Sequence, residues 1–242
     1  HNVANSMTPG FKRIRWHLVD AYNSLGSGLE TEDSLSELRR GLGLPVFEVD
    51  GCRLSHLLLD MKSGVLKETA RPLDLAIDGG GFFVAIQNGK TVYSRCGVMG
   101  LDAERRLCLT LGNIPAVLQP VITLPEDAKE IQITAKGEVL VLQTASSDAE
   151  QVGHLQLASF AAPERLRPLG ATLYAATEES GLASLGEPDS SGRGAIQQGC
   201  LEQSNVDVES EYADMERVQS LLKSIPVMAR PVTAGKTGTA SQ

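Results

Sequence analysis

The sequence lacks a long hydrophobic run and an excess of basic residues. No stretch approaches the ~18 consecutive apolar residues that a membrane-spanning helix needs, and no basic segment followed by an apolar one opens the chain. Acidic residues outnumber basic ones by 30 to 22, which gives a net charge of -8. This balance argues against binding to nucleic acid or to an anionic membrane. The sequence therefore predicts a soluble protein with neither of these partners.

Cysteine and histidine are scarce and scattered. The four cysteines form no Cys-x-x-Cys pair, and the four histidines do not cluster near them. This spacing argues against a zinc site and favours free or buried thiols over disulfides. We expect no metal and no cofactor. The cysteines are Cys52, Cys96, Cys108 and Cys200.

Two strings near the end of the chain imitate catalytic motifs without the surroundings that catalysis needs. Ser220-Leu221-Leu222-Lys223 matches the nucleophile motif of penicillin-binding proteins, and Lys236-Thr237-Gly238 matches their Lys-Thr-Gly motif. The two strings lie close together across Pro226 and Pro231, with no Ser-Asp-Asn between them. No room remains for a domain that would hold the serine. The sequence therefore predicts that the protein is not an enzyme.

Residues 71–175 have the pattern of a compact β-rich core domain. Short apolar runs with strand chemistry alternate there with Gly, Asn and Pro. Asn88-Gly89 is the pair favoured by a type I′ hairpin turn. Gly79-Gly80-Gly81 predicts a tight turn or bulge rather than a phosphate-binding loop, because no helix follows it. The fold is thus predicted to be mainly β, with strands at 73–77, 82–86, 107–111, 131–134, 139–142 and 154–160.

Residues 1–70 are predicted to form a junction of extended or short helical segments. The apolar residues between 11 and 22 fit one face of a helix, but an extended strand fits the same run equally well. Asn5 and Thr8-Pro9-Gly10 favour turns, so we expect them to end a helix and reverse the chain. Because the sequence opens at His1 within what reads as a helix-to-loop junction, we expect that an N-terminal partner helix is missing.

The C-terminal part is predicted to hold one helix at 206–225. A linker at 176–205, rich in Gly, Ser, Glu and Pro, precedes it, and a disordered tail at 226–242 follows. Asn205 or Asp207 serves as the expected N-cap, and Pro226 as the expected stop. One face carries an apolar stripe with helical spacing. The stripe consists of Val208, Tyr212, Met215, Val218 and Leu222.

Several motifs occur in the same order as in the flagellar rod and hook protein family. The string from Asn2 to Lys12 resembles the Asn-x-Ala-Asn-x-x-Thr-x-Gly-Phe-Lys signature found after the family's N-terminal helix. Residues 64–83 resemble its entry into the β domain, and Tyr93-Ser94-Arg95-Cys96-Gly97 resembles the Tyr-Thr-Arg-x-Gly stretch that follows. The string from Gln198 to Val206 is the most specific. These collinear matches identify the chain as a member of this family, more similar to the distal rod members than to the hook members.

The resemblance implies a structural subunit of the flagellar basal-body rod, which polymerises helically and transmits torque from motor to hook. Terminal helices would pack between subunits, while the β domain would form an outer layer. The implied partners are copies of the chain itself and neighbouring rod and hook proteins, with the flagellar type III export apparatus in transit. The implied location is the flagellar basal body, in the periplasm after export.

The C-terminus diverges from the family, because Pro226 and Pro231 lie where a long apolar helix is expected. The alternative function is therefore a soluble rod-associated adaptor or interaction module that uses the same β domain without polymerising. Each candidate residue is expected to have a local role in its own turn or helix. Whether it also contacts another subunit is left open. The candidate junction and assembly residues are Asn2, Asn5, Gly10, Phe11, Asn205, Val208, Tyr212, Met215 and Leu222.

Overall fold

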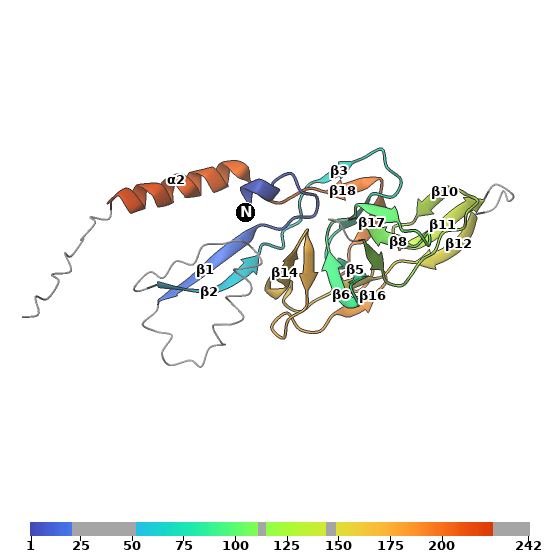
Figure 1. Cartoon of the computed structure of the whole chain (residues 1–242), viewed down its shortest axis with the longest axis horizontal. Coiled ribbons are helices and arrows are strands. Elements are labelled where there is room, and N and C mark those ends of the chain that lie inside the picture. Colours follow the sequence, from blue (N-terminus) through green and yellow to red (C-terminus); the bar gives the residue numbers. More distant parts are fainter. Residues whose placement is uncertain (21–51, 111–114, 144–148, 225–242) are drawn as a thin grey trace, which may run out of the picture. The chain divides into compact units, whose positions relative to one another are not determined.

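The computed structural model describes residues 1–20, 52–110, 115–143 and 149–224. The chain divides into a first unit, His1–Val206, and a second unit, Asp207–Gln242. The described elements of the first unit are β-strands and two short 3-10 helices, η1 (Val3–Asn5) and η3 (Pro163–Arg165) (Figure 1). The second unit contributes one described helix, α2 (Val208–Ser224). The prediction of a mainly β fold with a C-terminal helix is confirmed.

The main sheet of the first unit has nine strands, and its paired neighbours are antiparallel. These strands are β5 (Phe82–Gln87), β6 (Lys90–Ser94), β7 (Met99–Leu101), β8 (Leu107–Leu109), β9 (Ala116–Leu118), β13 (Leu157–Ser159), β14 (Arg167–Gly170), β15 (Leu173–Ala175) and β16 (Ser184–Gly186). Their order is β14-β15-β6-β5-β9-β8-β7, and β13 joins β16 to β5. Strand β5 therefore lies at the centre of this sheet.

The hairpin between β5 and β6 turns at Asn88-Gly89, as predicted. Both residues have left-handed backbones, with φ of 51° and 74°, and Gln87 pairs with Lys90 across the turn. Positive φ at both central residues is the requirement of a type I′ turn, which Asn-Gly meets at low cost. Gly79 and Gly81 also have positive φ, at the predicted turn that enters β5.

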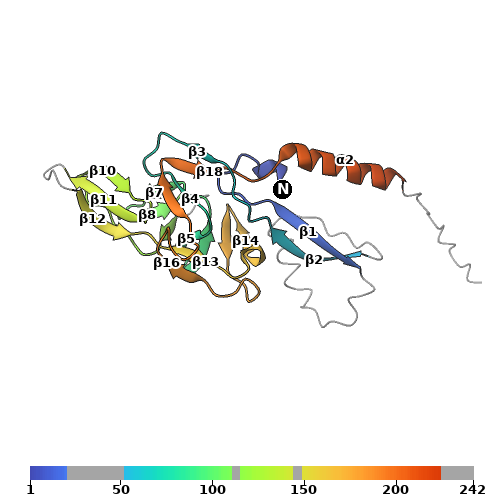
Figure 2. The ribbon, with the colours of Figure 1, turned by 180° about the vertical axis from the view of Figure 1, so that it is seen from behind.

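Four smaller sheets complete the first unit. One is the three-stranded sheet β10-β11-β12, which Figures 1 and 2 both place at the opposite end of the unit from the β1-β2 ribbon. The other three are antiparallel pairs, β1 with β2, β3 with β18 and β4 with β17. Their bounds are β1 (Ile14–Asp20), β2 (Cys52–Leu59), β3 (Leu66–Glu68), β4 (Leu75–Asp78), β10 (Ala128–Ile133), β11 (Glu138–Gln143), β12 (Ala149–His154), β17 (Ala195–Gln198) and β18 (Cys200–Glu202).

The main sheet is covered on both faces. Along β5, Phe83 and Ala85 enter the larger buried cluster, which also takes in residues of β8, β11 and β17. Phe82 and Val84 face the other way, into a second cluster with Phe11 and other residues of the N-terminal segment. Because alternate side chains of a strand point to opposite faces, burial of both faces explains why β5 reads as a continuous apolar run.

The run from residue 11 to 22, which fitted either a helix or a strand, is a strand where it is described. Ile14–Asp20 form β1, which pairs antiparallel with β2. The helical alternative is wrong there, because Ile14 and Trp16 lie opposite Leu59 and Leu57 of a second strand, far away in the sequence. Local periodicity carries no information on such a distant partner.

The predicted linker at 176–205 is extended but is not free of the β domain. It contains β16, β17 and β18, which pair with β13, β4 and β3. Its Gly and Ser residues serve turns rather than an open connection; Gly192 and Gly199, for example, have φ of 79° and 72°. The predicted strand at 154–160 is likewise split, because β12 ends at His154 and β13 begins at Leu157.

The described helix α2 of the second unit begins after Asp207. The Glu209 amide donates to Asp207 Oδ1 at 3.2 Å, so Asp207, one of the two predicted caps, occupies the N-cap. Tyr212, Met215 and Val218 are about half exposed on this helix. No helix in the described part of the chain is long and apolar enough to cross a membrane. The predicted stop at Pro226 and the tail at 226–242 lie outside the described residues.

Candidate functional site: a buried junction of three segments

The candidate site is a buried group of three charges that come from the start, the middle and the end of the first unit. Glu202 accepts hydrogen bonds from Lys12 Nζ at 2.7 Å and from Arg95 Nε at 2.8 Å, one on each carboxylate oxygen. The exposed fractions of the Lys12, Arg95 and Glu202 side chains are 1%, 4% and 0%. Charges so well removed from water need full pairing to be tolerated.

The backbone completes the hydrogen bonding of these charges. Glu202 Oε1 also accepts the Gly64 amide at 2.9 Å. Lys12 Nζ donates to the Lys62 carbonyl oxygen at 2.7 Å, and Arg95 donates to the carbonyl oxygens of Gly81 and Ile77. The cluster therefore ties β18 to the segments that precede β1 and β3, and to the end of β6.

The surroundings hold Glu202 in its charged form. Burial alone raises the pKa of this carboxyl, but the Arg95 and Lys12 charges and the hydrogen bonds from Lys12 and Gly64 outweigh burial, so the pKa is lowered. The carboxylate is therefore more stable in the folded protein than in the unfolded chain. Its protonation must weaken the junction.

This lowered pKa predicts a dependence of stability on pH. The contribution of Glu202 is expected to be complete above the ordinary glutamate pKa of about 4.3, and to be lost as the pH falls through the lower pKa of the folded state. Urea unfolding between pH 7 and pH 3 measures it. The stability difference between the wild type and Glu202→Gln should shrink on acidification, since the variant lacks this titration. A difference that stays constant over the range would contradict the prediction.

Asn205 is the second centre of the junction. Its Oδ1 accepts the Arg13 amide at 2.7 Å. Its Nδ2 donates to the carbonyl oxygens of Asp60 and Lys62 at 2.7 and 2.9 Å. One side-chain amide thus joins the same segments that Glu202 joins. The predicted capping role of Asn205 is replaced by this role, because the backbone groups that it meets belong to other segments.

Asn205→Asp is expected to lower the free energy of unfolding by about 2 kcal/mol. The substitution replaces the side-chain NH2 group, which donates two hydrogen bonds, by a carboxylate oxygen, which can only accept and would face the two carbonyl oxygens. Urea unfolding at pH 7 measures the change. Asn88→Asp is the matched control, since Asn88 is exposed in the β5–β6 turn and Asp also tolerates its backbone conformation. Equal losses in both variants would refute the role given to Asn205.

The other predicted junction residues of the first unit lie around the same group. Asn2 makes a reciprocal pair of bonds with the backbone of Ile14, both 3.0 Å. Asn5 donates to the His1 carbonyl oxygen at 2.9 Å. Phe11 is buried in the second apolar cluster, and the Gly10 amide donates to the Glu202 carbonyl oxygen at 2.7 Å. Each has a local role, and the subunit contacts expected of them stay a prediction.

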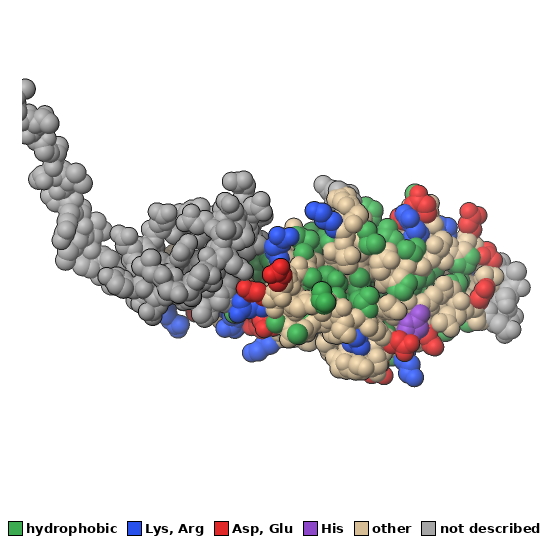
Figure 3. Space-filling view, turned by 90° about the horizontal axis from the view of Figure 1, so that it is seen from below, with side chains coloured by type: hydrophobic (Ala, Val, Ile, Leu, Met, Phe, Trp, Pro, Cys, Tyr) green, Lys and Arg blue, Asp and Glu red, His purple; other side chains and the backbone are tan. Residues whose placement is uncertain are grey.

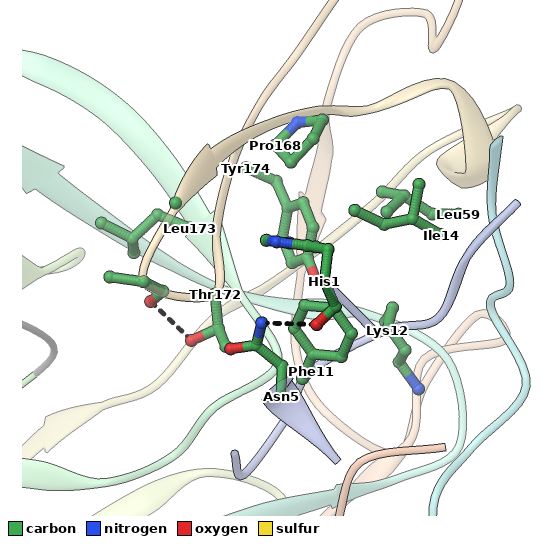
Figure 4. A pocket seen from close by; sticks show the side chains of 12 residues that line it. His1, Asn5, Phe11, Lys12, Ile14, Leu59, Pro168, Thr172, Leu173 and Tyr174 are labelled. Carbon is green, nitrogen blue, oxygen red and sulfur yellow. Dashed lines mark hydrogen bonds between the residues drawn. The ribbon is translucent and has the colours of Figure 1, made fainter. Parts of the chain in front are cut away.

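A small pocket lies beside the junction, between the N-terminal segment and the β14–β15 hairpin. Phe11, Ile14, Leu59 and Tyr174 line it with largely apolar surface (Figure 4). Among the described residues, no three or more His, Cys, Asp or Glu side chains are arranged to hold a metal ion. Cys96, Cys108 and Cys200 are free thiols.

The predicted assembly residues Val208, Tyr212 and Met215 lie on α2, in the second unit. The backbone of Leu222 is also in this helix. The structure therefore separates the candidate residues into a set in the first unit and a set on α2. Any contact that the α2 set makes with another subunit stays a prediction.

The three charged residues of the junction were missed as site residues. Each belongs to a motif that was recognised: Lys12 closes the string that begins at Asn2, Arg95 lies within the stretch from Tyr93 to Gly97, and Glu202 lies within the string from Gln198 to Val206. One sequence feature could have indicated that these charges are buried: Lys12 directly follows Phe11, and Glu202 directly follows Leu201, and both apolar residues are buried. The pairing of the charges was invisible, because residue 202 lies 190 positions from residue 12 and 107 from residue 95.

Comparison with known proteins gives a consistent result. The family described as "Flagellar hook protein FlgE/F/G D1 domain" matches residues 76–141. The flagellar basal-body rod protein FlgG of Agrobacterium fabrum is 32% identical over 222 residues, which cover 90% of this chain and 82% of that protein. FlgG of Borreliella burgdorferi is 30% identical, over 89% of this chain and 80% of that protein.

A hook protein is similar over a shorter part. The flagellar hook protein FlgE of Escherichia coli is 35% identical over 157 residues, which cover 63% of this chain but 34% of that protein. The relation to rod proteins extends over most of both chains, as the order of the sequence motifs predicted. This chain belongs to the family of flagellar basal-body rod proteins.

Proposed function

We propose that this chain is a structural subunit of the flagellar basal-body rod and lies in the flagellar basal body. The observation that carries the proposal is the collinear similarity to rod proteins over 90% of the chain. The proposed work is mechanical, and the chain is not an enzyme. A centre whose charges are paired with one another and with backbone groups of the fold supports this view.

The proposed subunit polymerises helically and transmits torque from motor to hook. Repeated heterologous contacts between identical subunits generate open helical assemblies. Exposed apolar side chains supply surface for such contacts: Tyr212, Met215 and Val218 on α2, and Leu182 in the first unit, which is 94% exposed. Figure 3 shows hydrophobic side chains gathered in the middle of one face of the first unit, bordered by charged ones. Exposed apolar surface of this kind is typical of protein contact sites.

The two sets of candidate residues have different roles in this proposal. Asn2, Asn5, Gly10, Phe11 and Asn205 hold the fold of the subunit itself. A separate set, on α2, makes contacts between subunits. That set is Val208, Tyr212, Met215 and Leu222.

The proposed partners are copies of the chain and neighbouring axial proteins of the rod and hook. The chain reaches its periplasmic site through the flagellar type III export apparatus. The net charge of -8 supports the absence of a nucleic-acid partner, and assembly does not involve insertion into the membrane.

The test is the recovery of the tagged, full-length protein in hook-basal bodies purified from its own host. The wild type is expected to copurify with them. Met215→Glu, which places a charge in the apolar stripe, is expected to be exported and folded but depleted from the particles. Glu216→Gln is the matched control, because Glu216 is an exposed neighbour on the same helix.

A protein that is exported but never enters hook-basal bodies is not a rod subunit. A protein that binds them without being needed for rod length is the soluble adaptor of the alternative hypothesis. Equal depletion of both α2 variants would refute the contact role of the stripe.

A further inference from the structure

We propose that the junction is a cooperative latch, in which three segments open and close as one unit while the main sheet stays folded. The segments are residues 10–14, residues 60–65 and residues 202–206. We call them the first, second and third latch segments. The inference concerns the fold of this chain alone and does not depend on its role in the rod.

The first argument is that each latch segment bonds to both of the others. The first and third are joined by Gly10 to Glu202, by Lys12 to Glu202 and by Arg13 to Asn205. The first and second are joined by Lys12 to the Lys62 carbonyl oxygen. A pair of segments without the third would therefore keep only part of its hydrogen bonds.

The contacts between the second and third segments complete the set. The Gly64 amide donates to Glu202 Oε1 at 2.9 Å, and the Gln203 amide donates to the Val65 carbonyl oxygen at 2.9 Å. Asn205 donates to the carbonyl oxygens of Asp60 and Lys62. Because the same two side chains, Glu202 and Asn205, serve both neighbouring segments, loss of one segment leaves buried groups unpaired on the other two.

The second argument is the cost of partial opening. Lys12 and Glu202 are nearly inaccessible to water. Separating them without opening the latch would leave a buried charge unpaired, which is more costly than hydrating both. The main sheet, by contrast, keeps its own hydrogen bonds and the larger apolar cluster, which contains no residue of the latch segments. On its other face it gives up the contacts with Phe11 and Ile14 and the hydrogen bond from Arg95 to Glu202. Partial states of the latch are thus less favourable than a fully open latch beside an intact sheet, and such a set of residues behaves as one cooperative unit.

The test is native-state hydrogen exchange on the full chain. The amides of Gly10, Arg13, Gly64 and Gln203, which bridge the three latch segments, are expected to have protection factors within about twofold of one another. The Leu107 amide of β8 in the main sheet, which donates to the Ile122 carbonyl oxygen, should be protected more strongly. Protection factors of these four amides that differ from one another by much more than twofold would overturn the proposal.

Glu202→Gln keeps the shape of the side chain and removes its charge. It is expected to lower the protection of all four latch amides by the same factor, about tenfold or more, while the Leu107 amide changes less than twofold. Arg13 is the decisive amide, because it donates to Asn205 and not to Glu202. A loss confined to Gly10 and Gly64 overturns the proposal, and so does an equal loss at Leu107, which would mean global unfolding.

Asn205→Ala is the second, independent variant, and keeps the test informative if Glu202→Gln does not fold. Here Gly10 and Gly64 become the decisive amides, because both are bonded to Glu202. They are expected to lose as much protection as Arg13. Glu68→Gln is the control, since this exposed residue of β3 lies opposite Cys200 of β18, and it should leave all four amides unchanged.

Discussion

Glu202→Ala is expected to lower the free energy of unfolding by about 3–5 kcal/mol, the cost of removing one partner from a buried ion pair. The substitution leaves the Lys12 and Arg95 charges together in a site that excludes water. It also removes the acceptor of the Gly64 amide. Urea unfolding at pH 7, followed by circular dichroism, measures the change. A loss of this size is a large fraction of the stability of an ordinary domain.

Glu68→Ala is the matched control for that experiment. Glu68 is exposed on β3, so its loss is expected to change stability by no more than about 0.5 kcal/mol. A further variant that combines Lys12→Met, Arg95→Met and Glu202→Leu separates charge imbalance from lost packing. It is expected to recover much of the loss, because replacing a whole buried charge cluster by apolar side chains is often nearly neutral. A Glu202→Ala effect as small as that of the control would contradict the burial of the cluster.

Gly10→Ala is expected to destabilise the protein by about 3 kcal/mol or more, for two reasons. Gly10 has a φ of 69°, where an L-residue pays roughly 1–2 kcal/mol. An added Cβ would also lie 2.3 Å from the backbone nitrogen of Cys96. Backbone atoms cannot rotate away as a side chain does, so either the Gly10 turn or the start of the Cys96 segment must move, with the strain of an overpacked site. Urea unfolding measures the sum.

Gly89→Ala separates the two reasons. Gly89 has a similar φ of 74° but no atom within 4 Å of its added Cβ, so it is expected to lose only the roughly 1–2 kcal/mol of backbone strain. Should Gly10→Ala lose no more than Gly89→Ala, the close approach of the N-terminal segment to Cys96 would not be present in solution.

The elements that were predicted correctly are those whose structure is determined by residues close together in the sequence. Asn88-Gly89 turns as a type I′ hairpin because its own backbone preferences select that turn. The strand at 139–142 shows the period of two and is found within β11. The helix after Asp207 follows from its cap and from its first-turn acidic residues, Glu209 and Glu211.

The elements that were missed, or that were left open between helix and strand as β1 was, depend on partners far away in the chain. β1 pairs with β2, and β18 pairs with β3, so neither β1 nor β18 can be stable on its own residues. The polar residues of the predicted linker, such as Gln197 and Gln198, resemble those of a loop until β4 is placed beside them. Similarly, the roles of Lys12, Arg95 and Glu202 exist only once the fold brings the three together. Distant pairing rather than local preference decided these outcomes.

The contact between Lys12 and Glu202 makes the part of the chain between these two residues tolerant of insertions. It closes a ring of chain between positions 190 residues apart, so the residues between them form an insertion whose two ends are held together. The entropy of closing such a ring grows slowly, by only ~0.6 kcal/mol for each doubling of its length. The outer sheet β10-β11-β12 is contributed by one continuous stretch of that ring. Additional domains can therefore be inserted there during evolution at little entropic cost, while the closing contact is kept.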